Sequence, residues 1–270
     1  MLTAELQPVH VAGETHTMSF STRHLDRARA ESFGATAEHY DRYRPEYPVD
    51  LIDDLVRLRA TDVLDVGCGT GKASAALSAR GLSVSGIEPD DRMADVARRR
   101  GLPVETTTFE AWEPGGRQFD LIVSADAWHW VNPAQGARKA AQVLAPGGHI
   151  ARFWSFHVLD DPTLVELDGV YRKHAPGVQV GGARQKSTDG VRDPLADSAE
   201  FVAAAQRNYR WSLALNADEW IGLIGTFSDH QRMAPTDRSA LFDGVREVIE
   251  SRGGTVRTTS GTFLQLARRV

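Results

Sequence analysis

Apolar and polar positions follow two different periods along residues 62–155. Short apolar runs bounded by glycine, proline or charged residues predict buried strands. The five predicted strands are Asp62–Val66, Leu82–Glu88, Pro103–Phe109, Phe119–Asp126 and His149–Ser155. Apolar residues three or four positions apart predict the helices between them, which are Lys72–Arg80, Arg92–Arg100 and Pro133–Leu144. Strands that alternate with helices in this way predict a parallel sheet with helices on both of its faces.

The pattern changes on either side of this stretch. Ser32–Pro48 is rich in tyrosine and arginine and is predicted to begin as a helix that Pro45 interrupts, and helical spacing resumes in Val49–Arg59. Val158–Gln206 has little strand pattern, and we interpret it as an inserted helical and loop segment over the substrate side of the sheet. The remaining predicted elements are the strand Asn208–Leu215, the helices Asp218–Thr226 and Thr236–Ser251, and the strand Thr255–Arg268.

These elements together predict an α/β fold. We expect a Rossmann-like, doubly wound sheet of seven strands that is mostly parallel, with an antiparallel last strand and helices on both faces. Residues 32–270 are expected to form one domain, and residues 1–31 are expected to be a poorly ordered N-terminal segment.

Composition and charge limit the classes of partner. The chain has 270 residues, a formal net charge of −5 and a pI near 6.0, and this acidic balance argues against nucleic acid. Cys68 is the only cysteine, so no disulfide can form within the chain. No apolar run approaches the ~20 residues of a membrane span, and Met1–Ser21 lacks the apolar core of a signal peptide. We therefore expect a cytoplasmic protein, a monomer or a homodimer, with no membrane partner.

A glycine-rich loop follows the first predicted strand in the sequence VLDVGCGTGKASAAL at Val63–Leu77. A phosphate-binding nucleoside triphosphatase loop would need serine or threonine after Gly71-Lys72 and glycine at position 66, but the chain has Ala73 and Val66. A dinucleotide fingerprint would need glycine at position 72, which is lysine. The loop therefore fits neither type of phosphate site.

Asp65, Gly67, Gly69 and Gly71 resemble the first motif of class I S-adenosylmethionine-dependent methyltransferases. Four further segments extend this resemblance over most of the chain: GIEPDDRMADVA (Gly86–Ala97), FDLIVSADAWHWV (Phe119–Val131), AAQVLAPGGHIARFW (Ala140–Trp154) and HYDRYRPEYP (His39–Pro48). The last segment is typical of a small-molecule branch that is similar to trans-aconitate methyltransferase.

The resemblance implies S-adenosyl-L-methionine as the cofactor and S-adenosyl-L-homocysteine as the product. Glycines let the backbone pass close to the cofactor, and the Asp65 carboxylate suits its ammonium group. Glu88, at the end of the second strand, suits the two ribose hydroxyls. Met93 is expected near the adenine, and Phe109 is expected to pack on it, because the acidic residue that the family often has there is missing. The full predicted cofactor set is Asp65, Gly67, Cys68, Gly69, Gly71, Glu88, Pro89, Met93, Phe109, Ser124, Tyr40 and Arg44.

The acceptor is expected beyond the end of the fourth strand, at Ser124-Ala125-Asp126-Ala127-Trp128-His129-Trp130. His129 is the candidate general base because its usual pKa lies near neutrality, and Asp126 is the candidate that orients it or holds the substrate. The alternative for His129 is a structural imidazole between two tryptophans. The predicted substrate-binding residues are Trp128, Trp130, Tyr43 and His157. The histidines have no metal-ligand spacing, so no metal is expected.

Three functions remain open from the sequence. The first is a methyltransferase that acts on a small molecule, with an oxygen of a hydroxyl or carboxylate as the acceptor. A base is needed for a hydroxyl but not for a carboxylate. The second is an NAD(P)-dependent oxidoreductase on a similar sheet, and the third is a non-catalytic S-adenosylmethionine-binding protein.

Overall fold

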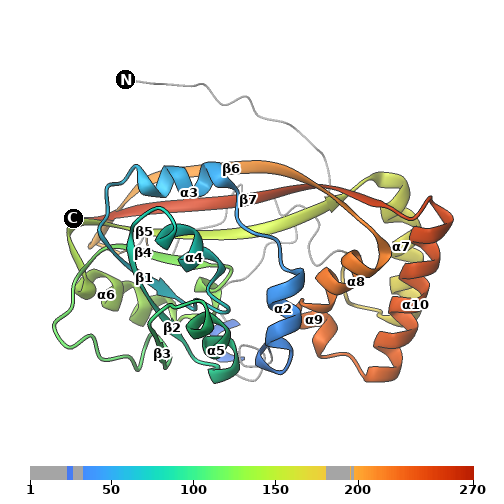
Figure 1. The fold of residues 1–270 in the computed structure, drawn as a ribbon, viewed down its shortest axis with the longest axis horizontal. Helices are drawn as coiled ribbons and strands as arrows, with labels where there is room; N and C mark the ends of the chain where they lie inside the picture. The colour runs from blue at the N-terminus through green and yellow to red at the C-terminus, as the bar shows by residue number, and fades with distance from the viewer. Residues whose placement is uncertain (1–22, 27–32, 181–194, 196–197) are drawn as a thin grey trace.

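A seven-stranded sheet forms the centre of the computed structural model, which describes residues 23–26, 33–180, 195 and 198–270 (Figure 1). The strand order is β3-β2-β1-β4-β5-β7-β6. The strands are β1 (Asp62–Val66), β2 (Ser83–Glu88), β3 (Val104–Thr106), β4 (Phe119–Ala125), β5 (Leu144–Leu159), β6 (Phe201–Leu215) and β7 (Val256–Arg269). Neighbours from β3 to β5 pair in parallel, and β7 is antiparallel to both β5 and β6. The predicted fold class is confirmed.

Two hydrophobic cores lie on opposite faces of this sheet. Successive residues of one strand point to opposite faces, so Leu64 of β1 belongs to one core and its neighbour Val63 to the other. The first core includes Ala140 of α6 (Pro133–Val143). The second includes Leu51 of α3 (Val49–Val56) and helix α4 (Lys72–Ser78). Helices on both faces cover the continuous apolar strands that the sequence predicted.

Capping residues define where several helices begin. The Asp90 side chain accepts a hydrogen bond from Arg92 N at the start of α5 (Asp91–Arg99). Asn216 and Glu219 form a capping box at α8 (Ala217–Gly225). The other helices of the second half of the chain are α7 (Asp161–His174), α9 (Ser228–Gln231) and α10 (Pro235–Ser251).

Strands β5, β6 and β7 run beyond the parallel part of the sheet and connect two lobes (Figure 1). One lobe holds β1–β4 with α4–α6, and the other holds α7–α10 around a third core that includes Leu167, Trp220 and Leu241. The sequence underestimated this extension. β5 continues to Leu159, and β6 begins at Phe201, within the segment that we interpreted as an insertion without strands.

Within the predicted insertion, α7 is the helical part, and residues 181–194 and 196–197 lie outside the described residues. Most of the predicted N-terminal segment also lies outside them. The exception is residues 23–26, which include the short helix η1 (Arg23–Leu25). Among the described helices, none combines the length and apolar character that a membrane crossing needs.

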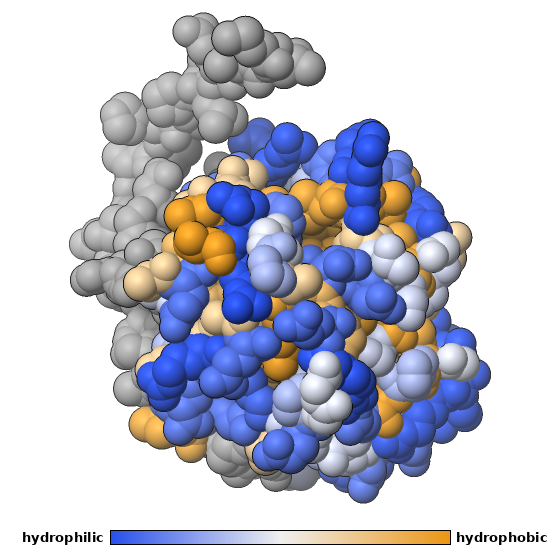
Figure 2. All heavy atoms as spheres, turned by 90° about the vertical axis from the view of Figure 1, so that its left-hand side faces the viewer, coloured by the Kyte–Doolittle hydropathy of each residue, from blue (hydrophilic) through white to orange (hydrophobic). Residues whose placement is uncertain are grey.

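The segment that precedes α3 packs between the two lobes. It contains η2 (Phe33–Thr36) and α2 (Ala37–Tyr43), and its Ala37 and Tyr40 join Met93 of α5 in a small apolar cluster. The face opposite the helical lobe is mostly hydrophilic, with apolar residues in small patches among polar ones (Figure 2). The apolar contacts of α2 are in the interior, since Ala37 and Met93 of this cluster are both buried.

Candidate active site

The glycine loop turns tightly between β1 and α4. Gly67, Gly69 and Gly71 have φ of +71°, +57° and +82°, a left-handed conformation that glycine adopts at little cost. Gly67 N and Cys68 N both donate to Ile87 O of β2, at 2.8 and 3.1 Å. The loop is thereby held against the end of the second strand.

Close neighbours exclude a side chain at two of these glycines. A Cβ on Gly67 would lie 2.5 Å from Ala127 Cβ, and one on Gly71 would lie 2.5 Å from Leu102 Cδ1. At Gly69 a Cβ would be 3.5 Å from Met93 Cε, which is an ordinary contact distance. Gly69 is therefore the position at which the loop could accept a ligand between its backbone and α5.

Two buried carboxyls lie beside the loop. Asp65 is fully buried, and its Oδ2 accepts a hydrogen bond of 2.6 Å from Ser74 Oγ, whereas its Oδ1 has no partner among the described residues. Burial raises the pKa of Asp65 to about 6. Glu88 accepts from Gly69 N and from Asp90 N, both at 3.0 Å, and burial raises its pKa to about 7. A cationic or hydroxyl-bearing ligand would favour the ionised form of both groups.

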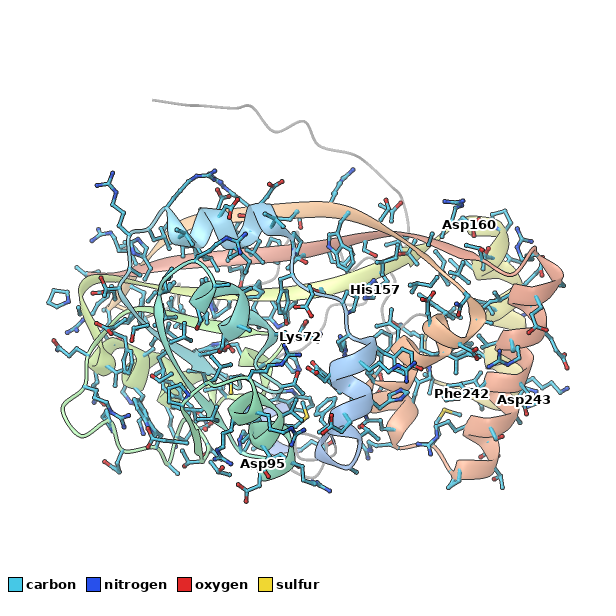
Figure 3. All side chains as sticks on the ribbon, viewed as in Figure 1. Lys72, Asp95, His157, Asp160, Phe242 and Asp243 are labelled. Carbon is cyan, nitrogen blue, oxygen red and sulfur yellow. The ribbon has the colours of Figure 1, made fainter. Side chains whose placement is uncertain are left out.

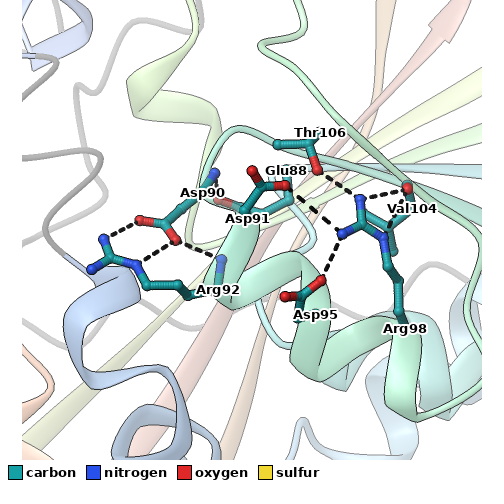
Figure 4. Close-up of polar contacts among 8 residues, drawn as sticks. All are labelled: Glu88, Asp90, Asp91, Arg92, Asp95, Arg98, Val104 and Thr106. Atoms are coloured by element: carbon teal, nitrogen blue, oxygen red, sulfur yellow. Dashed lines mark hydrogen bonds and ion pairs between the residues drawn. The ribbon is translucent and has the colours of Figure 1, made fainter.

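The end of β2 is organised by arginines of α5 (Figure 4). Asp90 forms two side-chain hydrogen bonds with Arg92, and Arg98 reaches Asp95, Val104 O and Thr106 Oγ1. These contacts tie α5 to β3 and leave Glu88 bonded to backbone amides alone. A Cβ at Gly34 would lie 2.0 Å from Asp90 Oδ1, so η2 closes tightly over the same strand end.

A pocket continues from the glycine loop to the long strands. It is lined by residues of α2 and the following turn, of the glycine loop and α4, and of the ends of β4, β5 and β6: Tyr40, Arg44, Pro45, Tyr47, Gly67, Cys68, Gly69, Thr70, Lys72, Ala73, Ala125, Asp126, Ser155, His157 and Trp211. Figure 3 shows two of its members, Lys72 from α4 and His157 from β5, in the region between the lobes.

Asp126 supplies the carboxylate of this pocket. It has φ of +54°, an unusual conformation for a residue other than glycine that tends to occur at functional sites. Its Oδ1 accepts from Ser155 N at 3.0 Å, and its Oδ2 accepts from Tyr47 OH at 3.4 Å. Burial raises the pKa of Asp126, and the Arg44 guanidinium opposes that shift. The strained backbone and these two donors fix the carboxylate at the end of β4.

His157 and Arg44 each pack against the ring of Phe227. The Arg44 guanidinium carbon lies 4.8 Å from the ring centroid, and the His157 ring is stacked at 6.4 Å. Burial, with Arg44 as the second cause, lowers the pKa of His157 to about 3. His157 Nε2 and Arg44 Nε are both buried without a partner among the described residues. Two hydrogen-bonding atoms at this end of the pocket are thus left for a ligand.

Comparison with known proteins decides the family. Residues 63–148 match the family model that is described as a methyltransferase domain. The uncharacterized methyltransferase Rv3342 of Mycobacterium tuberculosis is 32% identical over 221 residues, which cover 81% of this chain and 85% of that protein. The chain belongs to the class I S-adenosylmethionine-dependent methyltransferases.

Two further proteins are similar to this methyltransferase. The ubiquinone biosynthesis O-methyltransferase of Pseudomonas putida is 33% identical over 143 residues, which cover 47% of this chain and 62% of that protein. A solved structure from Anaeromyxobacter dehalogenans, described as a proposed type II methyltransferase, has a TM-score of 0.59 and 20% sequence identity to this chain. The alignment covers 84% of this chain and 98% of that chain. The structural likeness supports the shared fold. The narrower likeness to trans-aconitate methyltransferase stays a prediction.

The residues of the methyltransferase fit its cofactor, S-adenosylmethionine. The unpartnered Asp65 Oδ1 lies under the glycine loop, and the Thr70 hydroxyl in the loop is also buried without a partner among the described residues. The left-handed glycines leave backbone exposed where the amino-acid end of the cofactor would lie, and Glu88 keeps a free lone pair on each carboxyl oxygen. The same features would leave a pyrophosphate without the amide cradle that it needs.

The predicted cofactor residues fall into two groups. Those that line the pocket are Tyr40, Arg44, Gly67, Cys68 and Gly69. Those that lie beside the loop or under α2 are Asp65, Gly71, Glu88, Pro89 and Met93. The assignment of these ten residues to the cofactor stays a prediction.

Ser124 and Phe109 are used within the fold. Ser124 Oγ donates to Val66 O of the neighbouring strand at 2.8 Å. The Phe109 ring is buried among Trp112 and Trp128 in the first core, with centroid distances of 6.4 and 5.9 Å. The structure thus gives both side chains packing or hydrogen-bonding partners apart from a ligand.

The predicted acceptor residues do not all come together. Trp128 is buried in the first core, and Trp130 packs against Phe33 at 6.4 Å. His129 lies outside the residues that line the pocket, and its Nδ1 accepts from Trp154 Nε1 at 3.3 Å. Tyr43 packs on Gly222 of α8, where an added Cβ would meet its ring at 2.3 Å. Of the residues predicted for catalysis or acceptor binding, Asp126 and His157 line the pocket.

Sequence reasoning missed eight pocket residues, which are Pro45, Tyr47, Thr70, Lys72, Ala73, Ala125, Ser155 and Trp211. Lys72 directly follows the glycine loop and donates to Glu46 Oε1 at 2.6 Å, so its position in the motif was a usable signal. Ser155 and Trp211 carry no local motif. They reach the pocket because β5 and β6 extend beyond the parallel sheet.

Proposed function

We propose that this methyltransferase transfers the methyl group of S-adenosylmethionine to an oxygen of a small-molecule acceptor in the cytoplasm. The observation that carries the proposal is the continuous pocket from the glycine loop to Asp126, His157 and Trp211. One pocket that includes both a backbone cradle and a polar wall suits a cofactor and an acceptor placed end to end. The relative from Pseudomonas putida that is named as an O-methyltransferase adds support for oxygen. The absence of any possible disulfide within the chain suits the cytoplasm.

The cofactor end is assigned to the first half of the chain. Gly67 and Gly69 would hold the amino-acid portion, Asp65 would take the ammonium group, and Glu88 would accept from the ribose hydroxyls. The sulfonium of the cofactor supplies an already activated methyl group, so the chain needs to align the acceptor and exclude water. Tyr40 of α2 packs beside Met93 at this end, and the Arg44 guanidinium lies over both the Tyr40 and the Phe227 rings, so it reaches toward the acceptor end.

Asp126 is proposed as the group that receives a proton when the acceptor is a hydroxyl. Its raised pKa brings a carboxylate closer to the range in which it can act as a base, and Tyr47 and Ser155 N hold it in place. A carboxylate acceptor would need no base. The structural alternative for His129 is supported by its bond with Trp154, so we do not route the proton through it.

The test uses S-adenosylmethionine with a 13C-labelled methyl group and a heat-inactivated lysate of bacterial cells that is separated after the reaction into small molecules, protein and RNA. The chemical shift of the labelled methyl identifies the atom that carries it. The proposal expects an O-methyl product, and mild alkali would release methanol from an ester but not from an ether. Label found only on nitrogen, sulfur or carbon would refute the oxygen assignment, and label in protein or RNA would refute the small-molecule class.

The oxidoreductase alternative is answered by binding. Thermal unfolding with S-adenosylhomocysteine, NAD and NADP separates the two, because a ligand stabilises the protein in proportion to its affinity for the folded state. A shift with the nicotinamide cofactors alone would contradict the family assignment of the cofactor.

A further inference from the structure

Hydroxyl groups of the last strand hold the buried imidazole of His157. His157 of β5 lies directly opposite Ser260 of β7, and Trp211 of β6 lies opposite the same serine. His157 Nδ1 is 2.8 Å from Ser260 Oγ, which is 2.8 Å from Thr258 Oγ1. Ser260 and Thr258 are buried, so water does not compete for these groups.

The direction of the protons in this chain follows from counting donors. If His157 Nδ1 carried the proton, Ser260 would donate to Thr258, and the buried threonine hydroxyl would have no acceptor among the described residues. If Thr258 donates to Ser260 and Ser260 donates to Nδ1, every hydroxyl proton is used. Each arrangement leaves one buried donor without a partner among the described residues, which is Thr258 Oγ–H in the first and His157 Nε2–H in the second, and an unmade hydrogen bond of such a donor costs about 1–3 kcal/mol. His157 lines the pocket and Thr258 does not, so the second arrangement is favoured because it leaves its donor where water or a ligand in the pocket can accept from it. The proton of the neutral imidazole is then on Nε2.

We propose that the Thr258–Ser260–His157 chain fixes the imidazole with its Nε2–H directed to the pocket, where it donates to an oxygen of the acceptor molecule. This inference rests on the proposed function and extends it to the chemistry of the acceptor. His157 is then an acceptor-binding residue, and Ser260 is a positioning residue that acts through it.

The surroundings of His157 agree with a donor role. His157 lines the pocket, and its buried Nε2 has no partner among the described residues. Arg44, whose Nε–H is also without a partner among them, packs on the same Phe227 ring. Two N–H donors at one end of a pocket recognise oxygen lone pairs, as in a carboxylate or a carbonyl. They offer no acceptor to an ammonium or amidinium group, which would have to bind to the Asp126 carboxylate instead.

A further hydroxyl of β7 anchors two more residues on the same side of the pocket. Thr262, two residues after Ser260 on the same face, lies 3.3 Å from Ser155 Oγ and accepts from Trp211 Nε1 at 3.3 Å. Three pocket residues on two strands are thus anchored to alternate hydroxyls of one strand. Residues of β7, the strand between β5 and β6, therefore hold the side chains that line the acceptor end of the pocket and set its specificity.

The first test is 15N NMR of the histidine ring nitrogens in the full-length protein. The proposal expects His157 to be neutral from pH 5 to pH 8 with its proton on Nε2. Neutrality at the lower end follows from its pKa of about 3. A proton on Nδ1, or a charged ring within this range, would overturn the proposal. Neither outcome depends on methyl transfer, so the result is independent of whether the proposed function holds.

Two β7 variants sharpen the test. Ser260→Ala removes the partner of Nδ1 and is expected to yield a mixture of the two tautomers. Thr258→Val keeps the shape of the side chain, and Ser260 can still donate to Nδ1, so the Nε2–H tautomer is expected to persist. The proposal fails if the variants behave in the opposite way or if Ser260→Ala leaves a single Nε2–H form.

The second test uses benzoate, benzamide and benzamidine as probes with S-adenosylhomocysteine present. Benzoate and benzamide offer oxygen lone pairs, and only benzoate is charged, whereas benzamidine offers N–H donors alone. Benzoate or benzamide is expected to shift the Nε2–H proton resonance of His157, and the stronger response identifies a carboxylate or a neutral carbonyl. No response to either, or a response to benzamidine alone, would overturn the donor role.

Discussion

The two ends of the pocket are built in different ways. The cofactor end is a loop of consecutive residues, Asp65 to Lys72, whose backbone conformation creates the site. The acceptor end is a surface of side chains from β5, β6 and β7 that the antiparallel register brings into one row. A local motif can therefore identify the cofactor, but the acceptor depends on pairings between residues about 100 positions apart. This difference explains why the family is evident while the acceptor is a proposal.

The largest expected effect separates the two candidate bases at the acceptor end. If the acceptor is a hydroxyl, Asp126→Asn is expected to lower turnover by about 10²–10⁴-fold, because it removes a positioned base. Asparagine tolerates the left-handed backbone of this position, so the fold should be kept. His129→Ala is the matched comparison and should lower turnover by less than about tenfold, since His129 does not line the pocket. The reverse order of the two rates would move the base to His129.

A substitution in the loop tests the cofactor end. Gly69→Val is expected to weaken binding of S-adenosylhomocysteine by about 10³-fold, or about 4 kcal/mol, because the new side chain fills the space between the loop and Met93. Gly81→Val is the control, since Gly81 also has positive φ but has open space around it. Both variants should lose about 1–2 kcal/mol of stability from backbone strain. Calorimetry that finds equal affinities in the two variants would show that the loop does not hold the ligand.

Titration of Glu88 makes cofactor binding depend on pH. The pKa of Glu88 is raised to about 7, and a hydroxyl-bearing ligand binds its ionised form, so the affinity for S-adenosylhomocysteine should rise about tenfold between pH 6 and pH 8. Calorimetry should also detect proton release near pH 6. Glu88→Gln should bind more weakly and keep only the roughly twofold rise that Asp65, with a pKa of about 6, contributes in this range. An unchanged slope in that variant would exclude Glu88 as its source.

The same carboxyls give the protein without cofactor an unusual pH dependence of stability. Asp65 and Glu88 have folded pKa values of about 6 and about 7, above the ordinary values of 3.8 and 4.5 for these side chains. The folded state therefore binds more protons than the unfolded state between about pH 4 and 7, and the free energy of unfolding should fall as pH rises through that range. Chemical denaturation of the wild type and of Glu88→Gln would measure it. A wild-type stability that rises toward pH 7, or a fall of equal size in Glu88→Gln, would contradict this assignment.

The smallest effect concerns the ion pair between Lys72 of α4 and Glu46, which lies in the segment after α2. Lys72 Nζ lies 2.6 Å from Glu46 Oε1, but the Glu46 side chain is 65% exposed, and such a pair contributes about 0.2–1 kcal/mol. Glu46→Gln should change the affinity for S-adenosylhomocysteine by less than about fivefold, with the largest change at low salt. Glu113→Gln, an exposed carboxylate outside the pocket, is the control and should change nothing.

The same contrast explains which strands and pocket residues could be predicted from the sequence. Short apolar runs bounded by turn residues predicted the first five strands, because buried parallel strands are continuous apolar runs. The start of β6 was missed because Phe201–Leu215 is an edge strand with mostly exposed residues, and its pairing with β7 rather than its own pattern makes it a strand. Ser155 and Trp211 lie in strands that the sequence did predict, but no local pattern showed that both strands reach the pocket.

The histidines show this limit most clearly. His129 lies in a motif at the end of β4, so position in the sequence favoured it, but the structure uses its ring to accept a hydrogen bond from Trp154. His157 was supported by position alone, and the hydroxyls that orient it lie about 100 residues later in the chain. Thr258, Ser260 and Thr262 do alternate in the sequence, but only the register of β7 against β5 reveals what they hold.

A crystal structure with S-adenosylhomocysteine would test the division of the pocket most directly. The account predicts that the homocysteine portion lies on Gly67 and Gly69, that the ribose hydroxyls bond to Glu88, and that the sulfur faces the space between Asp126 and His157. A sulfur that faces away from these two residues, or a ribose without contact to Glu88, would contradict it.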